Sequence, residues 1–444
     1  MKLWEKGYSI ESAIETFTVG KDRELDLFLA PWDVLGTLAH ITMLTKINLL
    51  EESELAILKE ELISIYKQTE SGEFLIEDGV EDVHSQVELM LTQKLGDVGK
   101  KVHSGRSRND QVLVDLKLYF LDEIREMVAL TQELFETLQS LSEKYKDVLL
   151  PGYTHFQIAM PSSFGLWFGA YAESLVDDVL FFNAAYKVAD QNPLGSGAGY
   201  GSSFPLDRTL TTELLGFETL SYNVVYAQMG RGKTEKLLSF AMASLATTLN
   251  KLASDVCLYM SQNMGFLTFP KELTTGSSIM PHKKNPDVFE LIRARSNRLM
   301  ALPAEISQIT GNLPSGYHRD LQLVKESLLP AMEDLKACLS ITDYMLKNII
   351  VKDGIVKDSL YDYLFSVEMV NREVLNGIPF REAYRKIGEA IEKGEFQPIR
   401  SVEHSHEGSI GNLCNKEIAE KMNAALSGFN FAKFEKAIQN LLKN

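Results

Sequence analysis

The sequence contains few of the residues that mark secreted, zinc-binding or membrane proteins. Its three cysteines, Cys257, Cys338 and Cys414, are odd in number and far apart, which argues against a disulfide framework or a zinc motif and for a reducing compartment. No apolar run is long enough to cross a membrane, and the start MKLWEKGYSIESAIE lacks the basic and apolar regions of a secretory signal. We therefore expect a cytoplasmic protein.

Positive charge is also scarce in the 444 residues. Lysine and arginine together number 45 against 61 acidic residues, so the formal net charge is -16. This balance argues against a nucleic-acid or anionic-membrane partner, although a local basic pocket can still bind a small anion. The 45% hydrophobic and 24% charged content is typical of a globular chain, and the length predicts two or three domains.

Glycine and proline are absent from several long stretches, and these stretches are predicted helices. Residues 111–150 contain neither, which predicts a helix about 60 Å long at about 1.5 Å per residue. Similar runs cover residues 170–192, 233–264, 287–302 and 331–353, each with apolar residues three or four apart. Small residues on further faces of these helices indicate a bundle that is shared between subunits. The sequence thus predicts a mainly all-α fold.

Strand patterns are scarce, and residues 220–227, LSYNVVYA, are the best candidate for a strand. The places where the longest helices start and stop predict three domains. These are an N-terminal helical domain over 1–106, a central long-helix bundle over 107–355 and a small C-terminal helical domain over 356–444.

Residues 274–291, TTGSSIMPHKKNPDVFEL, form the most unusual connection between predicted helices. Asn285 can cap a helix, Pro286 suits its first position, and Asp287 suits the positive end of its dipole. The two lysines and two serines beside free helix amides also suit an anion. On these residues alone, a plain helix start and an anion site both remain open.

A second polar connection, KKVHSGRSRNDQV, covers residues 100–112 and ends where the longest helix starts. Asn109 or Asp110 is a candidate cap for that helix. Ser107 and Arg108, together with free backbone amides, would then face a carboxylate.

Two glycine-containing segments could suggest a nucleotide site. Residues 192–208, NPLGSGAGYGSSFPLDR, lack a clean G-x-G-x-x-G and lie between helical patterns, so a lid or a turn is favoured. Residues 227–234, AQMGRGKT, end like a phosphate loop, but Ala227 stands where its first glycine belongs. The helical remainder supplies no repeated βαβ units, and we expect no ATP binding.

Several segments together resemble the argininosuccinate lyase family of the fumarase/aspartase superfamily. They include GRSRNDQ, PGYTHFQIAMPSS, NPLGSGA, GSSIMPHKKNPDVFELIR and GYHRDLQLVKE, in the family's order, within a similarity that extends from about residue 30 to 391. GSSxMP marks the superfamily, whereas GRSRNDQ is particular to this family. The resemblance implies a three-domain helical subunit, a homotetramer with sites built from three subunits, and no cofactor or metal. It also implies reversible cleavage of argininosuccinate to arginine and fumarate in arginine biosynthesis.

This elimination requires a base, an acid and a cation near a carboxylate. By resemblance, Ser277 is the base, acting as an alkoxide that loop amides and nearby positive charge stabilise. Lys283 is the best source of that charge. His155 suits the acid for the departing nitrogen, with Thr154 or a water between them.

The resemblance also implies a set of substrate-binding residues. Those for the succinyl carboxylates are Ser107, Arg108, Asn109 and Asn285; those for the other polar groups are Tyr317, Gln322 and Lys325, with Asp26 for the amino end of the arginine moiety. Each also has a structural interpretation, as a solvated charge, a packed ring, a capping group or a hydrogen-bonding brace. For Asp26 and for His84 in EDVH, the two interpretations are equally favoured.

Two stretches depart from the family's pattern where it contacts the arginine moiety. Arg231 lies in MGRGK, without the usual flanking acidic residues and serine, and residues 18–26, TVGKDRELD, replace a serine-containing segment. The alternatives are therefore a sibling lyase for adenylosuccinate or a modified argininosuccinate, and a non-catalytic structural protein of the crystallin type. Retention of Ser277, Lys283 and His155 argues against the latter.

Overall fold

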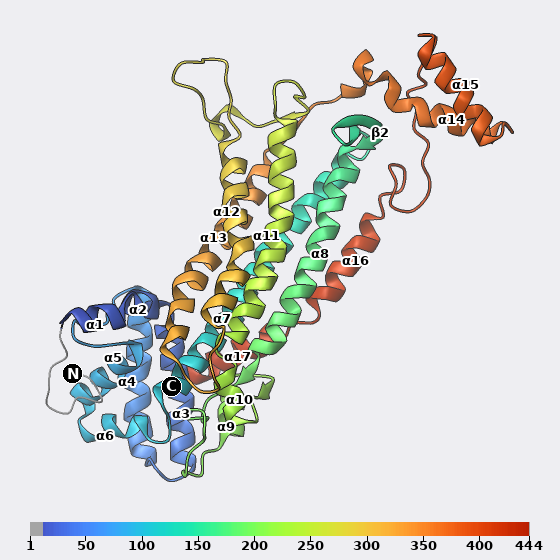
Figure 1. Ribbon diagram of the computed structural model, residues 1–444. Coiled ribbons are helices and arrows are strands. Elements are labelled where there is room, and N and C mark those ends of the chain that lie inside the picture. Colours follow the sequence, from blue (N-terminus) through green and yellow to red (C-terminus); the bar gives the residue numbers. More distant parts are fainter. Residues whose placement is uncertain (1–11, 444) are drawn as a thin grey trace.

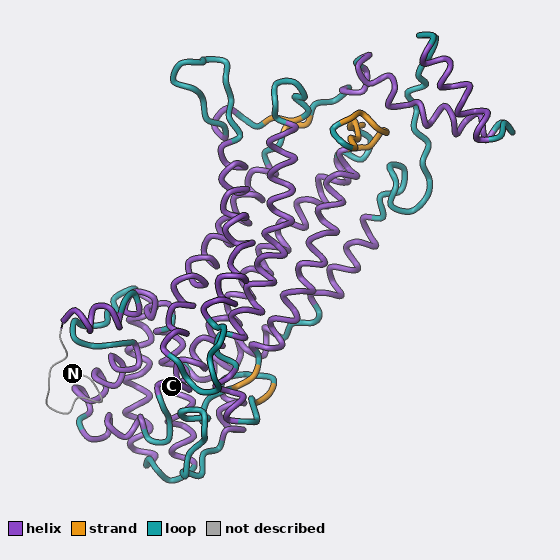
Figure 2. The backbone as a smooth tube through the Cα atoms, viewed as in Figure 1, coloured by secondary structure: helices purple, strands orange, loops and turns teal. Residues whose placement is uncertain are grey.

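A bundle of long helices dominates the computed structural model, which describes residues 12–443 (Figure 1). The long helices are α7 (Arg108–Lys144), α8 (Phe164–Ala189), α11 (Lys233–Tyr259), α12 (Asp287–Ile309) and α13 (Leu323–Lys347). Figure 2 shows that strands are confined to short segments near the ends of this bundle. The predicted mainly all-α class is confirmed.

The start of α7 is fixed by a capping box. The side chain of Ser107 accepts a hydrogen bond from the Asn109 amide, and the Ser107 amide donates to Asp110 Oδ1 at 2.8 Å. We predicted the cap at Asn109 or Asp110, and this was wrong by two or three positions. The cap is Ser107, because a short hydroxyl followed three residues later by a carboxylate satisfies two free amides at once.

The predicted helix limits were also wrong where proline was taken as a stop. α12 continues through Pro303, and α13 begins before Pro330 and passes through it. Packing explains this, because Pro303 is buried between the core residues Leu302 and Ile306. At its start, α12 has Pro286 and not Asn285 in the capping position.

The core of the bundle follows the apolar stripes of the sequence. On α11, Leu238, Ala241, Leu245 and Leu249 are at most 1% exposed, and this helix packs against α12 and α8. α7 packs against α8 and α13. Burial of these stripes, rather than helix propensity alone, stabilises the long helices.

Shorter helices surround the end of the bundle where α7 begins (Figure 1). They are α1 (Ser12–Val19), α2 (Asp22–Leu25), η1 (Asp26–Phe28), α3 (Ala30–Lys46), α4 (Glu52–Ser71), α5 (Val83–Leu95), α6 (Asp97–Lys100) and η2 (Lys101–His103). α3 contacts both α7 and α4, which joins these helices to the bundle. Among residues 12–443, no single helix has the length and apolar composition of a membrane span; residues 16–28 and 30–46 meet that test only together, across a 76° bend.

A β-hairpin lies at the opposite end of the bundle, at the top of Figure 1. It pairs β1 (Leu149–Thr154) with β2 (Gln157–Ser163), and its two turn residues, His155 and Phe156, have φ of 54° and 56°. Two smaller pairs are β3 (Gln191–Asn192) with β4 (Thr219–Leu220), and β5 (Leu267–Thr268) with β6 (Ile350–Val351).

The strand predicted over residues 220–227 was mostly wrong. Only Thr219–Leu220 forms a strand, and residues from Val224 to Met229 form the helix α10. Its start is set by Asn223, whose side chain accepts hydrogen bonds from the amides of Val225 and Tyr226. This cap overrides the preference of β-branched residues for strands.

The remaining elements connect or cover the bundle. They are α9 (Arg208–Leu214), η3 (Lys271–Leu273), η4 (Arg319–Gln322), η5 (Ile355–Lys357), η6 (Ser359–Phe365), α14 (Ser366–Leu375), α15 (Phe380–Glu392), α16 (Asn415–Leu426) and α17 (Phe431–Leu441). α14 and α15 share a small separate core, whereas α16 packs against α8 and α17 against α9 and α3. The division into three domains, with boundaries near residues 106 and 355, stays a prediction.

Candidate active site

A cavity of about 490 Å³ lies where α7 begins, between the N-terminal helices and the start of α13. It brings together seven of the predicted site residues: Asp26, Ser107, Arg108, Asn109, Tyr317, Gln322 and Lys325. Its other lining residues are Asp22, Glu81, Asp82, His84, His103, Val112, Arg231 and Arg319. Most are charged or polar, which suits a small ligand with several charged groups.

One end of the cavity holds a buried cation between two carboxylates. The Lys325 ammonium lies 2.8 Å from Asp22 Oδ1 and 2.5 Å from Asp26 Oδ1. Burial opposes the charge of Lys325, but the carboxylates of Asp26 and Asp22 outweigh it and raise the pKa of the ammonium. Of the two carboxylates, Asp22 is the more accessible, with 16% of its side chain exposed against 3% for Asp26. This end carries one more negative charge than positive.

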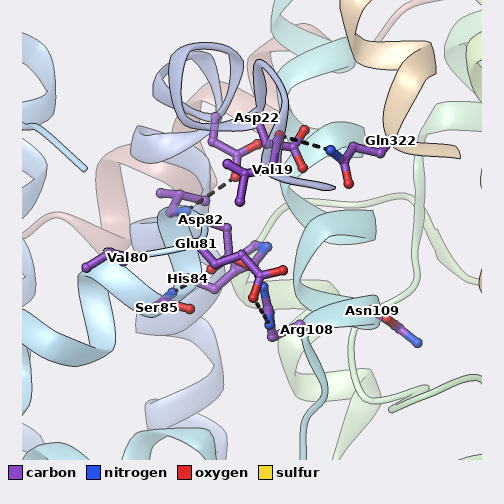
Figure 3. A network of polar contacts seen from close by, with 12 residues as sticks. Val19, Asp22, Val80, Glu81, Asp82, His84, Ser85, Arg108, Asn109 and Gln322 are labelled. Carbon is purple, nitrogen blue, oxygen red and sulfur yellow. Dashed lines mark hydrogen bonds and ion pairs between the residues drawn. The ribbon is translucent and has the colours of Figure 1, made fainter. Parts of the chain in front are cut away.

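Gln322 lies at the same end and holds the N-terminal segment in place. Its side-chain amide donates to the backbone oxygens of Thr18 and Val19, at 3.1 and 3.0 Å (Figure 3). The predicted substrate-binding residue Gln322 therefore also anchors the end of α1 beside Asp22 in this structure.

Arg231 forms part of the same wall through a buried ion pair. Its Nε lies 2.9 Å from Glu235 Oε1, and both side chains are 3% exposed. The other oxygen of Glu235 accepts from the Gly232 amide at 2.7 Å. A phosphate loop needs free amides, so this interaction agrees with the expectation that AQMGRGKT is not one.

The opposite wall of the cavity pairs two arginines with acidic residues that follow one another in EDVH. Arg108 makes ion pairs with Glu81, at 3.2 Å, and with Asp82, while Arg319 pairs with Glu81 at 2.6 Å. Figure 3 shows Arg108 facing this acidic pair and Asn109 pointing away from it. An anionic ligand would therefore have to compete with Glu81 and Asp82 for these guanidinium groups.

Sequence reasoning did not assign Asp22, Glu81, Asp82 or Arg319 to the site. The motif EDVH was a usable signal, since two adjacent carboxylates before a helix need partners. Their partners lie on α7 and η4, however, and only the fold shows this.

The glycine-rich segment 192–208 supports the site from behind. The amides of Gly195 and Gly197 each donate to Asp110 Oδ2 at 2.9 Å, and both glycines have positive φ. Burial raises the pKa of Asp110 to about 6, although three backbone amides oppose the shift. The segment is a turn packed on the start of α7; of the lid and the turn predicted from the sequence, the structure shows the turn.

The other five predicted site residues lie outside the cavity. Thr154 and His155 are exposed at the hairpin turn, and Lys283 is exposed in the loop before α12. In that loop, Ser277 and Asn285 are partly buried. The hairpin and the loop lie at the end of the bundle opposite the cavity (Figure 1).

Distance separates these residues from the cavity within one chain. α7 has 37 residues and starts at the cavity, so at about 1.5 Å per residue it extends about 55 Å away from it. A single chain therefore does not bring Ser277 or His155 to Ser107 and Lys325.

The loop holds Ser277 by backbone hydrogen bonds. Its Oγ accepts from the amides of Ile279 and Met280, at 3.3 and 3.1 Å. The Asn285 amide donates to the Thr275 carbonyl at 2.9 Å and closes the loop. Two amides directed at one hydroxyl oxygen favour negative charge on it.

One cluster of carboxylates and histidine in residues 12–443 has the compactness of a metal site. Oxygens of Asp33 and Asp115 and a ring nitrogen of His84 lie within 4.8 Å of one another. However, His84 Nδ1 is only 2.7 Å from Asp33 Oδ1, a hydrogen-bond distance. A cation about 2.1 Å from each ligand would hold neighbouring ligands about 3 Å or more apart, so a shared proton fits this pair better.

Comparison with known proteins adds a family assignment to this geometry. A family model described as lyase matches residues 11–301. The chain is 62% identical over 441 residues to an argininosuccinate lyase of Bacteroides fragilis, with 99% of both chains covered. It is 39% identical over 388 residues to an argininosuccinate lyase of Thermotoga neapolitana, covering 87% of this chain and 98% of the relative.

Two solved structures share the fold at low sequence identity. A variant of EDDS lyase with bound fumarate aligns with a TM-score of 0.76 at 20% identity, covering 98% of this chain and 94% of that one. A class II fumarase from Schistosoma mansoni aligns with a TM-score of 0.73 at 16% identity, covering 99% and 95%.

Proposed function

The chain belongs to the argininosuccinate lyase family, and from this premise we propose how its residues divide the reaction. It is a carbon–nitrogen lyase that cleaves argininosuccinate reversibly to arginine and fumarate. The observation that carries this function is the 62% identity over nearly the whole of both chains. Neither adenylosuccinate cleavage nor a crystallin-type structural role has comparable support.

The charges of the cavity orient the substrate. The arginine moiety, with its ammonium group, lies at the end where Asp22 and Asp26 outnumber Lys325. The succinyl carboxylates lie at Ser107, Arg108 and Asn109, where the positive end of the α7 dipole favours anions.

Residues of the loop before α12 and of the β1–β2 hairpin carry out the elimination. Ser277 takes the proton from the carbon next to a succinyl carboxylate, while Lys283 stabilises the charge that develops on that carboxylate. The carbon–nitrogen bond breaks, the carbon–carbon double bond of fumarate forms, and His155, directly or through Thr154 or a water, protonates the departing nitrogen. Two backbone amides at Ser277 Oγ support its role as an alkoxide.

Assembly completes the site, because one chain keeps cavity and loop at opposite ends of the bundle. The protein is a homotetramer whose long helices form a common core, and several subunits build each site. Large apolar residues support this packing, since the bundle exposes Leu180 by 54%, Phe240 by 45%, Leu291 by 61% and Tyr344 by 52%. The proposed location is the cytoplasm, which agrees with free thiols at all three cysteines.

Release of fumarate tests the function directly. Ultraviolet absorbance is followed after adding argininosuccinate or adenylosuccinate to the assembled protein in parallel. Fumarate from argininosuccinate alone is the expected result. Release only from adenylosuccinate would assign the chain to the sibling activity, and no release from either would favour a structural role.

A further inference from the structure

His84 lies beneath the cavity between two buried carboxylates. Its Nδ1 is 2.7 Å from Asp33 Oδ1 and 3.5 Å from Asp115 Oδ2, and the carboxylate side chains are each 1% exposed. The His84 side chain keeps 5% of its surface exposed, and the residue lines the cavity. Both carboxylates therefore face the Nδ1 side of the ring, which leaves Nε2 for other partners.

Most oxygens of the Asp33 and Asp115 carboxylates have no hydrogen-bond donor among the described residues. Within residues 12–443, Asp33 Oδ2 and both oxygens of Asp115 are buried and accept no hydrogen bond. Buried carboxylates are costly unless a charge or donor compensates them. The His84 ring lies within 3.5 Å of an oxygen of each carboxylate and can supply such a group.

With both carboxylates ionised, the charges around His84 are one positive charge short. Counted as ionised, Asp33 and Asp115 contribute two negative charges, although burial and the Asp33 charge raise the pKa of Asp115. Asp26 acts at longer range and shares the Lys325 cation with Asp22. Arg106 contributes one buried positive charge, although its hydrogen bond goes to Thr37.

The other histidine at this wall does not supply the missing charge. Burial and the Arg106 charge lower the pKa of His103 to about 4, so its ring is neutral at neutral pH. Glu88, which lies on the same helix as His84, faces His103 at 3.6 Å. A proton on His84 or on Asp115 therefore has to balance the cluster.

We propose that the two buried carboxylates keep His84 doubly protonated, so that its Nε2–H donates a hydrogen bond into the cavity to a carboxylate of the substrate. A neutral ring that donates from Nδ1 to Asp33 would leave Nε2 as an acceptor, which repels a carboxylate. Burial opposes the charge, but Asp33, Asp115 and Asp26 outweigh it and raise the pKa of His84.

This role fills a gap in the cavity. The guanidinium groups of Arg108 and Arg319 are already paired with Glu81 and Asp82. The carboxylates contact His84 at Nδ1, and the residue lines the cavity, so in this proposal Nε2–H is the donor that the ring offers to a ligand. The identity of the ligand rests on the proposed function, whereas the protonation state of His84 does not.

Nitrogen NMR of the assembled protein, labelled with ¹⁵N at its histidine rings, tests the protonation state. The His84 signals are identified by their loss in His84→Gln, and both ring nitrogens are expected to carry protons at pH 7 and pH 8. A single protonated nitrogen at pH 7 would place the extra proton on Asp115 and overturn the proposal.

Asp115→Asn tests the cause of the protonation. Removing an opposite charge within about 4–6 Å should lower the pH at which His84 titrates by about one unit or more. The surface change Asp97→Asn should leave this titration unmoved, because Asp97 pairs only with Lys100 among the interactions described. An unchanged titration in Asp115→Asn would show that the carboxylate does not hold the proton.

Calorimetric binding of succinate tests the role of Nε2–H. His84→Gln should weaken succinate about tenfold, in line with the loss of one charged hydrogen bond. Asp115→Asn should make binding weaken as pH rises through the lowered pKa of His84. Unchanged affinity in both folded variants would overturn the binding role, even with an imidazolium seen by NMR. Failure of the wild-type protein to release fumarate would instead reject the proposed function and leave the NMR result intact.

Discussion

The cavity and the loop that carries Ser277 are built in opposite ways. In the cavity the charged groups are buried and paired, as Lys325 is with two carboxylates and Arg231 is with Glu235. In the loop, Lys283 is exposed, and hydrogen bonds from the backbone hold Ser277. The difference supports the proposal that the cavity supplies most of the substrate-binding groups, and that the loop with its eliminating groups joins it from another subunit.

The largest expected effect comes from removing the proposed base. Ser277→Ala should reduce turnover by at least about 10² to 10⁴-fold, the usual contribution of a general base, because a hydroxyl is lost without a change in charge. Succinate affinity, measured by calorimetry, should stay the same. Ser278→Ala is the matched control and should keep activity; the reverse pattern would exchange the roles of the two serines.

A large loss of stability is expected from breaking the buried charge cluster of the cavity. Lys325→Met leaves the carboxylates of Asp22 and Asp26 without their cation, which should cost about 3–5 kcal/mol of unfolding free energy. Denaturant unfolding measures this. Lys347→Met removes a pair with Asp343 whose lysine is 56% exposed, and it should cost about 1 kcal/mol or less. Equal losses in the two variants would contradict the contrast between buried and exposed pairs.

A smaller effect is expected at the acidic end of the cavity. Asp22→Asn removes the more accessible carboxylate, so the KM for arginine in the reverse reaction should rise about tenfold, as for loss of one charged hydrogen bond. The KM for fumarate should change little, because its carboxylates lie at the other end. A rise in the KM for both arginine and fumarate would show that Asp22 does not act on the arginine end alone.

The smallest effect is expected from nucleotide. The Gly232 amide donates to Glu235 and is not available to bind a phosphate. We therefore expect no ATP binding, and millimolar ATP should leave the melting temperature unchanged, because only a ligand that binds the native state raises it. EDTA should likewise leave activity unchanged. A shift of several degrees with ATP, or activity restored by zinc or magnesium after EDTA, would contradict these expectations.

The long helices could be predicted from sequence because their pattern is local. Runs without glycine or proline and with apolar stripes, such as residues 238–249, indicate a helix whatever element it packs against. Pro303 and Pro330 could not be anticipated inside helices, because tertiary packing overrides their local cost. The helix α10 was missed because the cap at Asn223 outweighs the strand preference of two valines.

The candidate site residues were chosen through motifs, and these motifs do not give the geometry of the cavity. The family resemblance selected seven residues that the fold brings into one cavity. It did not reveal that Glu81 and Asp82 pair with Arg108, because these contacts join residues 27 and 26 positions apart in the sequence. Nor does a motif in the sequence show that the loop before α12, which carries Ser277, lies at the other end of the bundle (Figure 1).

The central claim is that the cavity of one chain works with the Ser277 loop of another. It is tested most directly by unfolding, mixing and refolding two variants, Ser277→Ala and Asn109→Leu, each of which is expected to be inactive alone. A site works when the cavity comes from a Ser277→Ala chain and the loop from an Asn109→Leu chain. With random equal mixing in a symmetric tetramer, about a quarter of the sites meet both conditions.

The measurement is fumarate release by the mixture, compared with each variant refolded alone and with refolded wild type as a control for yield. The account predicts about a quarter of the wild-type activity from the mixture and almost none from either variant alone. No recovery in tetramers shown to contain both chains would contradict it, because a site made within one chain gains nothing from mixing.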